Sequence, residues 1–144
     1  MKKFSFDLQK VLEYRNFEKQ QAEGELAKAL AVETEINENL KQIAQQYTAV
    51  KAQMKDSKDF DDIISQSKYN NLLDYQKEEL LKQLAESKIV IEQKREVLRE
   101  CMKKTTALEK LRDKQLEDWK AAVDYEEAEL LDDIKTSSGT HFHQ

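Results

Sequence analysis

An apolar heptad repeat that runs without a break from Leu8 to Met54 is the feature that most constrains the fold of this chain. Eleven of its fourteen seam positions are apolar, and the three exceptions are charged. Sustained spacing of this kind is typical of a helix in a coiled coil. We therefore predict a first helix over about residues 4–55. The seam consists of Leu8, Leu12, Arg15, Lys19, Ala22, Leu26, Ala29, Glu33, Ile36, Leu40, Ile43, Tyr47, Val50 and Met54.

A second repeat predicts a longer helix over about residues 62–134. Its register is clear as far as Leu108 and loosens afterwards, although the helical rhythm of apolar residues continues to Ile134. Residues 136–144 read TSSGTHFHQ, which predicts a disordered tail. The clear part of the seam consists of Leu73, Leu80, Leu84, Ile91, Leu98, Cys101 and Leu108.

Turn-forming residues are almost absent, because the chain has no proline and two glycines. The pattern breaks at the segment DSKDFDD, residues 56–62, which predicts a hairpin corner. Lysines at 51, 55 and 58 suit the negative end of one helix dipole, and the aspartates after them suit the positive end of the next. Asp59 and Asp61 are alternative N-cap residues for the second helix.

Neither helix can bury its apolar stripe alone, and a short corner forces the two into antiparallel contact. The sequence thus predicts an all-α fold, an antiparallel two-helix coiled-coil hairpin in which the second helix is longer than the first. Residues 1–135 would form this single domain, with facing residues whose numbers add to about 120. The second helix would overhang the first from about Leu116.

Composition excludes several classes of function. The net charge of −5 lacks the basic footprint of a nucleic-acid-binding protein. No stretch approaches the roughly twenty apolar residues that a membrane span needs, so we expect no membrane insertion. The first residues are interrupted by charge too early for a secretory signal. Cys101 is the only cysteine, which favours a reducing cytoplasm.

No residue pattern points to catalysis, and we predict no enzyme activity, no cofactor and no metal. His141 and His143 could form a two-ligand clip, but further ligands are missing nearby, so an inert tail is favoured. Cys101 lies in the seam, where a small core residue is a better interpretation than a nucleophile. The carboxylates alternate with lysines at helical spacing, which indicates a solvated face.

Three features could bind proteins. Basic residues of segment 94–114 and of the N-terminus could form a collar for an acidic partner, or be ordinary flank charge. The overhang, residues 116–135, carries eight acids and two lysines around apolar residues such as Trp119, which favours a partner site over a self-dimer contact or a fraying end. Near the corner lies an aromatic cluster for which packing is the favoured interpretation: Tyr47, Phe60, Tyr69 and Tyr75.

Two terminal motifs resemble a known family. The opening FSFDLQKVLEYRNFEKQQAEGELAKA and the later ALEKLRDKQLEDWKAAVDYEEAELLDDI are similar to the N- and C-terminal signatures of the FliJ family of flagellar export proteins. The middle is similar only as coiled coil. The matching residues are Leu8, Val11, Leu12, Arg15 and Glu18 in the first motif, and Leu108, Glu109, Leu111, Arg112, Trp119, Glu127, Leu131, Asp132 and Asp133 in the second.

The resemblance implies a coiled coil like the central stalk subunit of rotary ATPases. It implies three partners: the hexameric flagellar export ATPase, the export gate membrane protein and empty export chaperones. Both termini would enter the ATPase ring, whereas gate contacts would lie in the middle, where Tyr47, Tyr69 and Leu72 are plausible. The protein would be cytoplasmic, peripheral at the cytoplasmic face of the inner membrane, and a monomer when alone.

Two alternatives share these features. The equivalent stalk protein of a virulence type III secretion system would have the same fold and role. A purely structural coiled coil that dimerises in parallel along its whole length would use the same heptads between two chains.

Overall fold

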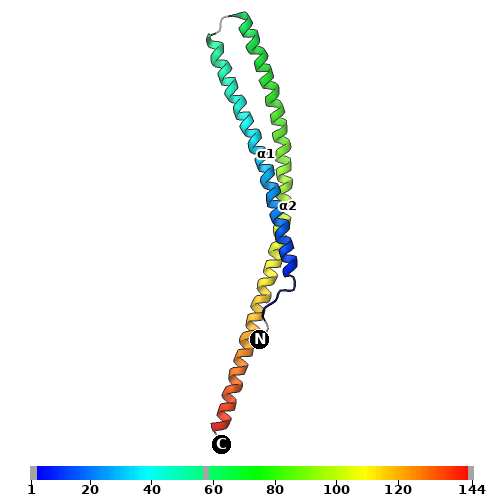
Figure 1. The fold of residues 1–144 in the computed structure, drawn as a ribbon, viewed down its shortest axis with the longest axis vertical. Helices are drawn as coiled ribbons and strands as arrows, with labels where there is room; N and C mark the ends of the chain where they lie inside the picture. Colours follow the sequence, from blue (N-terminus) through cyan, green and yellow to red (C-terminus); the bar gives the residue numbers. More distant parts are fainter. Residues whose placement is uncertain (1–2, 57–58, 143–144) are drawn as a thin grey trace. The chain divides into compact units, whose positions relative to one another are not determined.

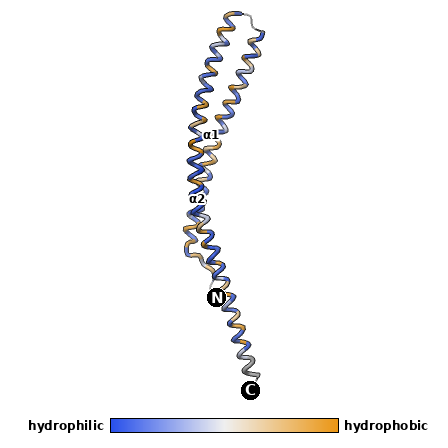
Figure 2. Tube along the Cα trace, turned by 180° about the vertical axis from the view of Figure 1, so that it is seen from behind, coloured by the Kyte–Doolittle hydropathy of each residue, from blue (hydrophilic) through white to orange (hydrophobic). Residues whose placement is uncertain are grey.

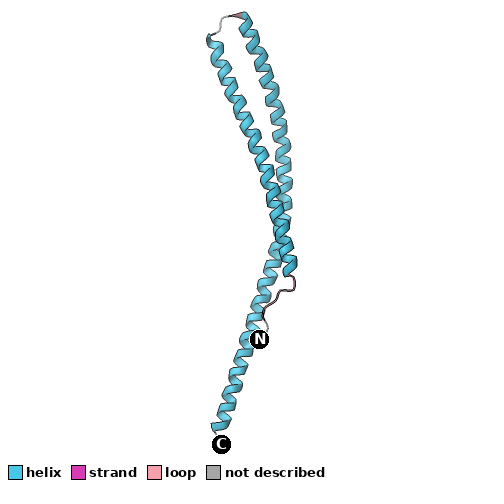
Figure 3. Ribbon diagram, in the orientation of Figure 1, coloured by secondary structure: helices cyan, strands magenta, loops and turns pink. Residues whose placement is uncertain are grey.

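The computed structural model describes residues 3–56 and 59–142, with side chains described for residues 3–55 and 59–137. These residues form two helices, α1 (Gln9–Asp56) and α2 (Phe60–Phe142), joined by a short corner (Figures 1 and 3). The helices have 48 and 83 residues and pack against each other. The predicted all-α architecture with a longer second helix is therefore confirmed.

Both helices are shared between two compact units. The corner unit is Gln20–Glu100, and the terminal unit combines Met1–Lys19 with Cys101–Gln144. In the corner unit, α1 and α2 lie side by side and antiparallel in both views (Figures 1 and 2). Hydrophobic and hydrophilic residues alternate along both helices in Figure 2, as expected for helices that each bury one stripe.

The corner unit is held by the predicted heptad seam. On α1, Ala22, Ile36, Ile43 and Val50 are buried, and every seam position between them is partly buried. The buried residues on α2 are Leu73, Ser87 and Ile91. Ser87 lay outside the predicted seam because it is polar.

Cross-helix contacts in the corner unit confirm the predicted register. The Tyr47 hydroxyl donates a hydrogen bond to Asp74 Oδ1. Lys94 Nζ lies 3.9 Å from Glu25 Oε2. In each pair the residue numbers add to about 120, the value that the position of the corner predicts.

The terminal unit has a smaller core. Leu12 and Thr105 are each 2% exposed, and Phe6 is 7% exposed. Leu108 and Glu109 are both partly buried, and from Glu109 the row continues through Arg112, Leu116, Trp119 and Val123 in alternating steps of three and four. The heptad register therefore shifts by one residue at Leu108, the point after which the sequence predicted a looser register.

The first helix begins later than the predicted residue 4. The Gln9 amide donates to the Phe6 carbonyl at 3.1 Å, and the first helical bond runs from the Leu12 amide to the Leu8 carbonyl at 2.9 Å. Residues 3–8 are not helical. The reason is tertiary: Phe6 is buried and Phe4 meets Trp119 on α2, contacts that offset the helical hydrogen bonds given up.

Asp59 is the N-cap of α2. Its Oδ1 accepts a hydrogen bond from the Asp61 amide at 3.2 Å, and its carbonyl accepts the Ile63 amide at 3.1 Å. Asp61 and Asp62 lie in the first turn, and Lys55 lies in the last turn of α1. This is the charge distribution that the helix dipoles favour. Lys58, which the sequence also placed at the corner, lies outside the described residues.

The second helix extends to Phe142, beyond the predicted end at Ile134. No proline interrupts this stretch, and Gly139 lowers helix stability by only about 1 kcal/mol relative to alanine. The backbone therefore continues as helix into the segment for which the sequence predicted a tail. His143 lies outside the described residues.

Candidate protein-binding surfaces

The described residues contain no helix that is long and apolar enough to cross a membrane. Within the same residues, no group of three or more His, Cys, Asp or Glu side chains is placed to hold a metal ion. Cys101 is a free, partly buried thiol in the seam. The exposed apolar residues of both helices are the candidates for binding another protein.

One row of apolar residues on α2 in the terminal unit is partly buried at its start and exposed at its end. Leu116, Trp119 and Val123 are partly buried, and the Phe4 ring lies 6.0 Å from the Trp119 ring at an angle of 57°. Leu130 and Ile134 continue the row but are 59% and 54% exposed. The uncovered part thus begins after Val123 and not at the predicted Leu116, and the Phe4 ring covers the earlier part at Trp119.

The uncovered end of α2 is strongly acidic. Residues 124–134 carry six carboxylates and no basic residue. Glu127, Asp132 and Asp133, all predicted as partner-binding residues, are exposed, and Leu131 between them is 60% exposed. The Tyr125 hydroxyl donates to Glu129 Oε1 at 2.9 Å. An apolar strip with acidic edges is suited to a partner surface that is apolar with basic edges.

The residues of the N-terminal motif differ in exposure. Leu12 is buried in the core, whereas Leu8 and Val11 are exposed. Arg15 Nη1 lies 3.2 Å from Glu18 Oε1, and its guanidinium carbon lies 5.9 Å from the centre of the Tyr14 ring. Leu12 is therefore a core residue, whereas Leu8 and Val11 are accessible to a partner.

Sequence reasoning missed two exposed aromatic residues on α1 of the terminal unit. Tyr14 is 59% exposed and Phe17 is 54% exposed. Both fall outside the heptad seam, and an aromatic residue at an outer heptad position was the signal that could have found them. With Val11 they form an apolar strip at successive steps of three residues.

The basic residues of segment 94–114 are only partly available as a collar. Arg99 Nη2 lies 2.8 Å from Glu92 Oε1, and Arg99 also pairs with Glu96. The hydrogen bond that Arg99 donates to Glu92, together with the charges of both carboxylates, raises the pKa of Arg99. In the terminal unit, Arg112 lies 4.0 Å from Asp113, and the predicted Leu111 beside it is exposed. Ordinary flank charge thus accounts for part of this segment.

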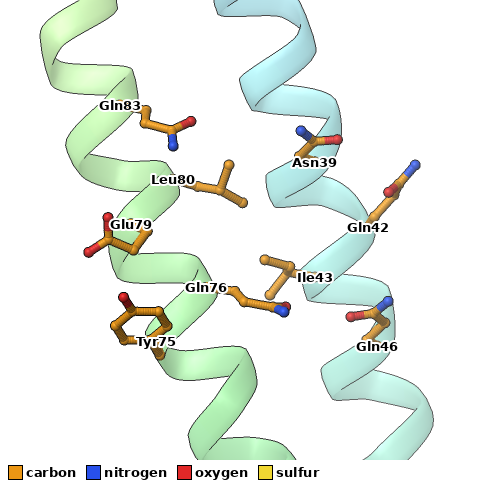
Figure 4. A pocket seen from close by; sticks show the side chains of 9 residues that line it. All are labelled: Asn39, Gln42, Ile43, Gln46, Tyr75, Gln76, Glu79, Leu80 and Gln83. Carbon is orange, nitrogen blue, oxygen red and sulfur yellow. The ribbon is translucent and has the colours of Figure 1, made fainter.

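A groove of about 340 Å³ lies between α1 and α2 in the corner unit (Figure 4). Ile43, Leu80 and Gln76 point into the space between the helices, and more amide side chains line its edges. Of these residues, the sequence had singled out Tyr75 in the aromatic cluster, and Ile43 and Leu80 as seam residues. The lining consists of Asn39, Gln42, Ile43, Gln46, Tyr75, Gln76, Glu79, Leu80 and Gln83.

A second groove, of about 410 Å³, shares Asn39 and Gln83 with the first, so the two are continuous. Its apolar lining includes Val32 and Val90, and Glu35 and Glu86 lie at its edges. No lysine or arginine lines either groove. The predicted middle residues lie elsewhere: Tyr69 and Leu72 are exposed, and Tyr47 is partly buried and bonded to Asp74.

Asp74 also stabilises the neutral form of Tyr47. The carboxylate accepts the phenolic proton in a hydrogen bond, and together with partial desolvation and its own charge it raises the pKa of Tyr47 from 10.0 to about 12. A neutral phenol at position 47 therefore persists well above the pH at which an ordinary tyrosine ionises.

These features define a class: a two-helix antiparallel coiled coil that offers uncovered apolar surfaces to other proteins. The family model described as "Flagellar FliJ protein" matches residues 4–139. The chain therefore belongs to the FliJ family, a family of non-catalytic flagellar export proteins, and is a component of the export apparatus with partners there. Comparison with curated proteins and with solved structures gave no match.

Proposed function

We propose that the chain binds the hexameric flagellar export ATPase with its terminal unit and the export gate membrane protein with its corner unit, and that it escorts empty export chaperones. It acts in the cytoplasm, peripherally at the inner membrane. The observation that carries this proposal is the uncovered apolar row at Leu130 and Ile134, edged by carboxylates.

Exposed apolar rows of this kind are typical of surfaces that are covered by a partner. The row is continuous with the packed seam, so a partner that covered it would extend the coiled-coil packing already present. The six carboxylates of residues 124–134 favour a partner lined by lysine and arginine, and would speed the encounter of the two proteins.

The role in the ATPase ring is one of preferential binding. A protein without catalytic groups promotes assembly of a ring only if it binds the assembled ring more tightly than the free subunits. A single helical end that contacts several subunits at once satisfies this condition, because the complete set of contacts exists only in the ring.

The test is ATPase stimulation by variants of the uncovered end. Leu130→Glu with Ile134→Glu should abolish stimulation, whereas Ala128→Glu, which adds a carboxylate on the opposite face of the same segment, should leave it intact. Deletion of residues 124–144 should abolish stimulation and leave the rest of the chain helical by circular dichroism. Full stimulation by either row variant would refute the assignment of this end.

The continuous groove of the corner unit is our candidate for the gate contact. It combines apolar side chains with amides that can bond to a polypeptide, and its edge charges are all acidic. Gln42→Arg with Gln83→Arg should weaken binding to the gate protein and leave ATPase stimulation unchanged. Asn37→Arg, at an exposed position outside the groove, is the matched control; equal loss with this control would argue against the groove.

The contacts within one chain in each unit support a hairpin and not a parallel dimer. Light scattering should give a mass near the 16.9 kDa of one chain. A mass twice as large would favour the structural coiled coil. The match to a flagellar family favours flagellar export over the virulence system, and deletion of the gene should abolish swimming while virulence secretion continues.

A further inference from the structure

Five apolar residues of α2 lie in one row on a single face of the helix. They are Leu116, Trp119, Val123, Leu130 and Ile134, at intervals of three, four, seven and four residues. The first three are partly buried, and the last two are exposed. A partner that follows this row from Ile134 toward the core meets Trp119 on its way.

The N-terminal strap, residues 3–8, already occupies part of this row. Phe4 packs against Trp119 with ring centres 6.0 Å apart, and Phe6 is only 7% exposed. The strap is not helical, and one turn hydrogen bond, from the Gln9 amide to the Phe6 carbonyl at 3.1 Å, connects it to the start of α1. It is therefore held mainly by side-chain packing, which can be given up without breaking a helix.

The strap covers the row with an aromatic side chain. It presents an aromatic ring to Trp119 and carries an exposed lysine, Lys3. Glu117 and Asp118 precede Trp119, Lys120 follows it, and six further carboxylates lie in residues 124–134. The strap also carries an exposed aspartate, Asp7, so the likeness to the partner contact proposed above rests on its aromatic packing against the row and not on a net charge.

We propose that the strap competes with the partner: it must leave Trp119 before an apolar, basic-edged protein surface can bind the row from Leu116 to Ile134. This inference rests on the proposed function, which supplies the export ATPase as that partner. When a site is open only part of the time, its apparent affinity is the affinity of the open site multiplied by the fraction of time that it is open. Weakening the strap therefore strengthens binding.

The first measurement uses the chain alone. Trp119 is the only tryptophan, so its fluorescence reports directly on the strap. Phe4→Ala should shift the emission to longer wavelength and increase quenching by acrylamide. Ser5→Ala, an exposed change within the strap, should do neither. Unchanged emission in Phe4→Ala would overturn the inference. Circular dichroism should show full helicity, because residue 4 precedes α1.

The second measurement is the affinity for the purified export ATPase hexamer. Phe4→Ala should bind about tenfold more tightly than the wild type, corresponding to a strap that is open roughly one tenth of the time. Deletion of residues 1–6 should give at least the same gain, since it also removes Phe6. Ser5→Ala should bind like the wild type.

The outcomes separate the two proposals. If the wild type binds and both strap variants bind equally or more weakly, the strap is not a competitor, and the proposed function stands. If Leu130→Glu with Ile134→Glu abolishes binding while Phe4→Ala strengthens it, both are supported. If no form binds the hexamer, the proposed function fails and this inference fails with it.

Discussion

The corner unit and the terminal unit are built from the same two helices, but they bury their apolar residues to different extents. In the corner unit, buried residues extend from Ala22 to Val50 on α1 and face Leu73, Ser87 and Ile91 on α2. In the terminal unit, Val123 is the last partly buried residue in the described part of α2, and residues 124–137 are all exposed. Helical periodicity is present in both. An amphipathic pattern therefore shows that a face can be covered, not that the chain itself covers it.

The sharpest test of this contrast removes one leucine from each unit. Leu73 is 1% exposed, so Leu73→Ala should lower the free energy of unfolding by about 2–4 kcal/mol through lost burial and a cavity. Leu130 is 59% exposed, and Leu130→Ala should change it by less than about 0.5 kcal/mol. Urea unfolding followed by circular dichroism measures both. Equal losses would mean that Leu130 is covered by another copy in solution.

Replacing a buried hydroxyl in the terminal unit should increase the stability of the protein. Thr105 is 2% exposed, and its Oγ1 has no hydrogen-bond partner among the described residues. Thr105→Val keeps the shape and removes the unsatisfied group, which should raise the free energy of unfolding by about 1–2 kcal/mol.

The matched control is Thr34→Val in the corner unit. The Thr34 hydroxyl is exposed and donates to the Leu30 carbonyl at 3.0 Å, so its loss should be close to neutral. Destabilisation by Thr105→Val in the same urea experiment would show that the buried hydroxyl has a partner in solution, such as a water molecule.

A smaller increase in stability is expected from a substitution at Gly24, an interior position of α1 in the corner unit. A Cβ added there would meet nothing within 4 Å. Gly24→Ala should therefore stabilise the protein by about 0.5–1 kcal/mol, because glycine loses more backbone freedom on folding. Ala27→Gly, at a neighbouring exposed position, should cause a loss of similar size. Thermal unfolding measures both, and a loss for Gly24→Ala would indicate a close contact at that face.

The finest test concerns Tyr47, whose neutral form is stabilised by Asp74 in the corner unit. Because its folded pKa is raised to about 12, the contribution of this pair to stability is complete below pH 10 and is lost as the pH rises through about 12. Absorbance at 295 nm should show one phenol, that of Tyr47, ionising only as the pH approaches 12.

Asp74→Ala should return that tyrosine to the range of an ordinary phenol. Glu78→Ala removes a carboxylate from the same stretch of α2 and should leave the late ionisation in place. Late ionisation that persists in Asp74→Ala would assign the effect to burial and not to the carboxylate.

Much of the candidate site could be read from the sequence because its residues belong to the heptad pattern or to the acidic end. Leu131, Asp132 and Asp133 are exposed beside the uncovered row. Tyr14 and Phe17 were missed because exposed aromatic residues leave no mark on the seam. The grooves of the corner unit were missed because amide side chains carry no periodic signal, and only their position between two helices makes them a surface.

The sequence by itself determined the two helices, their antiparallel register and a corner capped by an aspartate, because these follow from local spacing and from charges within a few residues; the structure decided that the cap is Asp59 and not Asp61. Only the tertiary structure decided that Phe4 and Phe6 leave the helix to form a strap on α2, that Thr105 and Ser87 fill seam positions, and that the uncovered row begins after Val123. These outcomes depend on how much apolar area distant segments bury against each other. Local periodicity contains no information on that quantity.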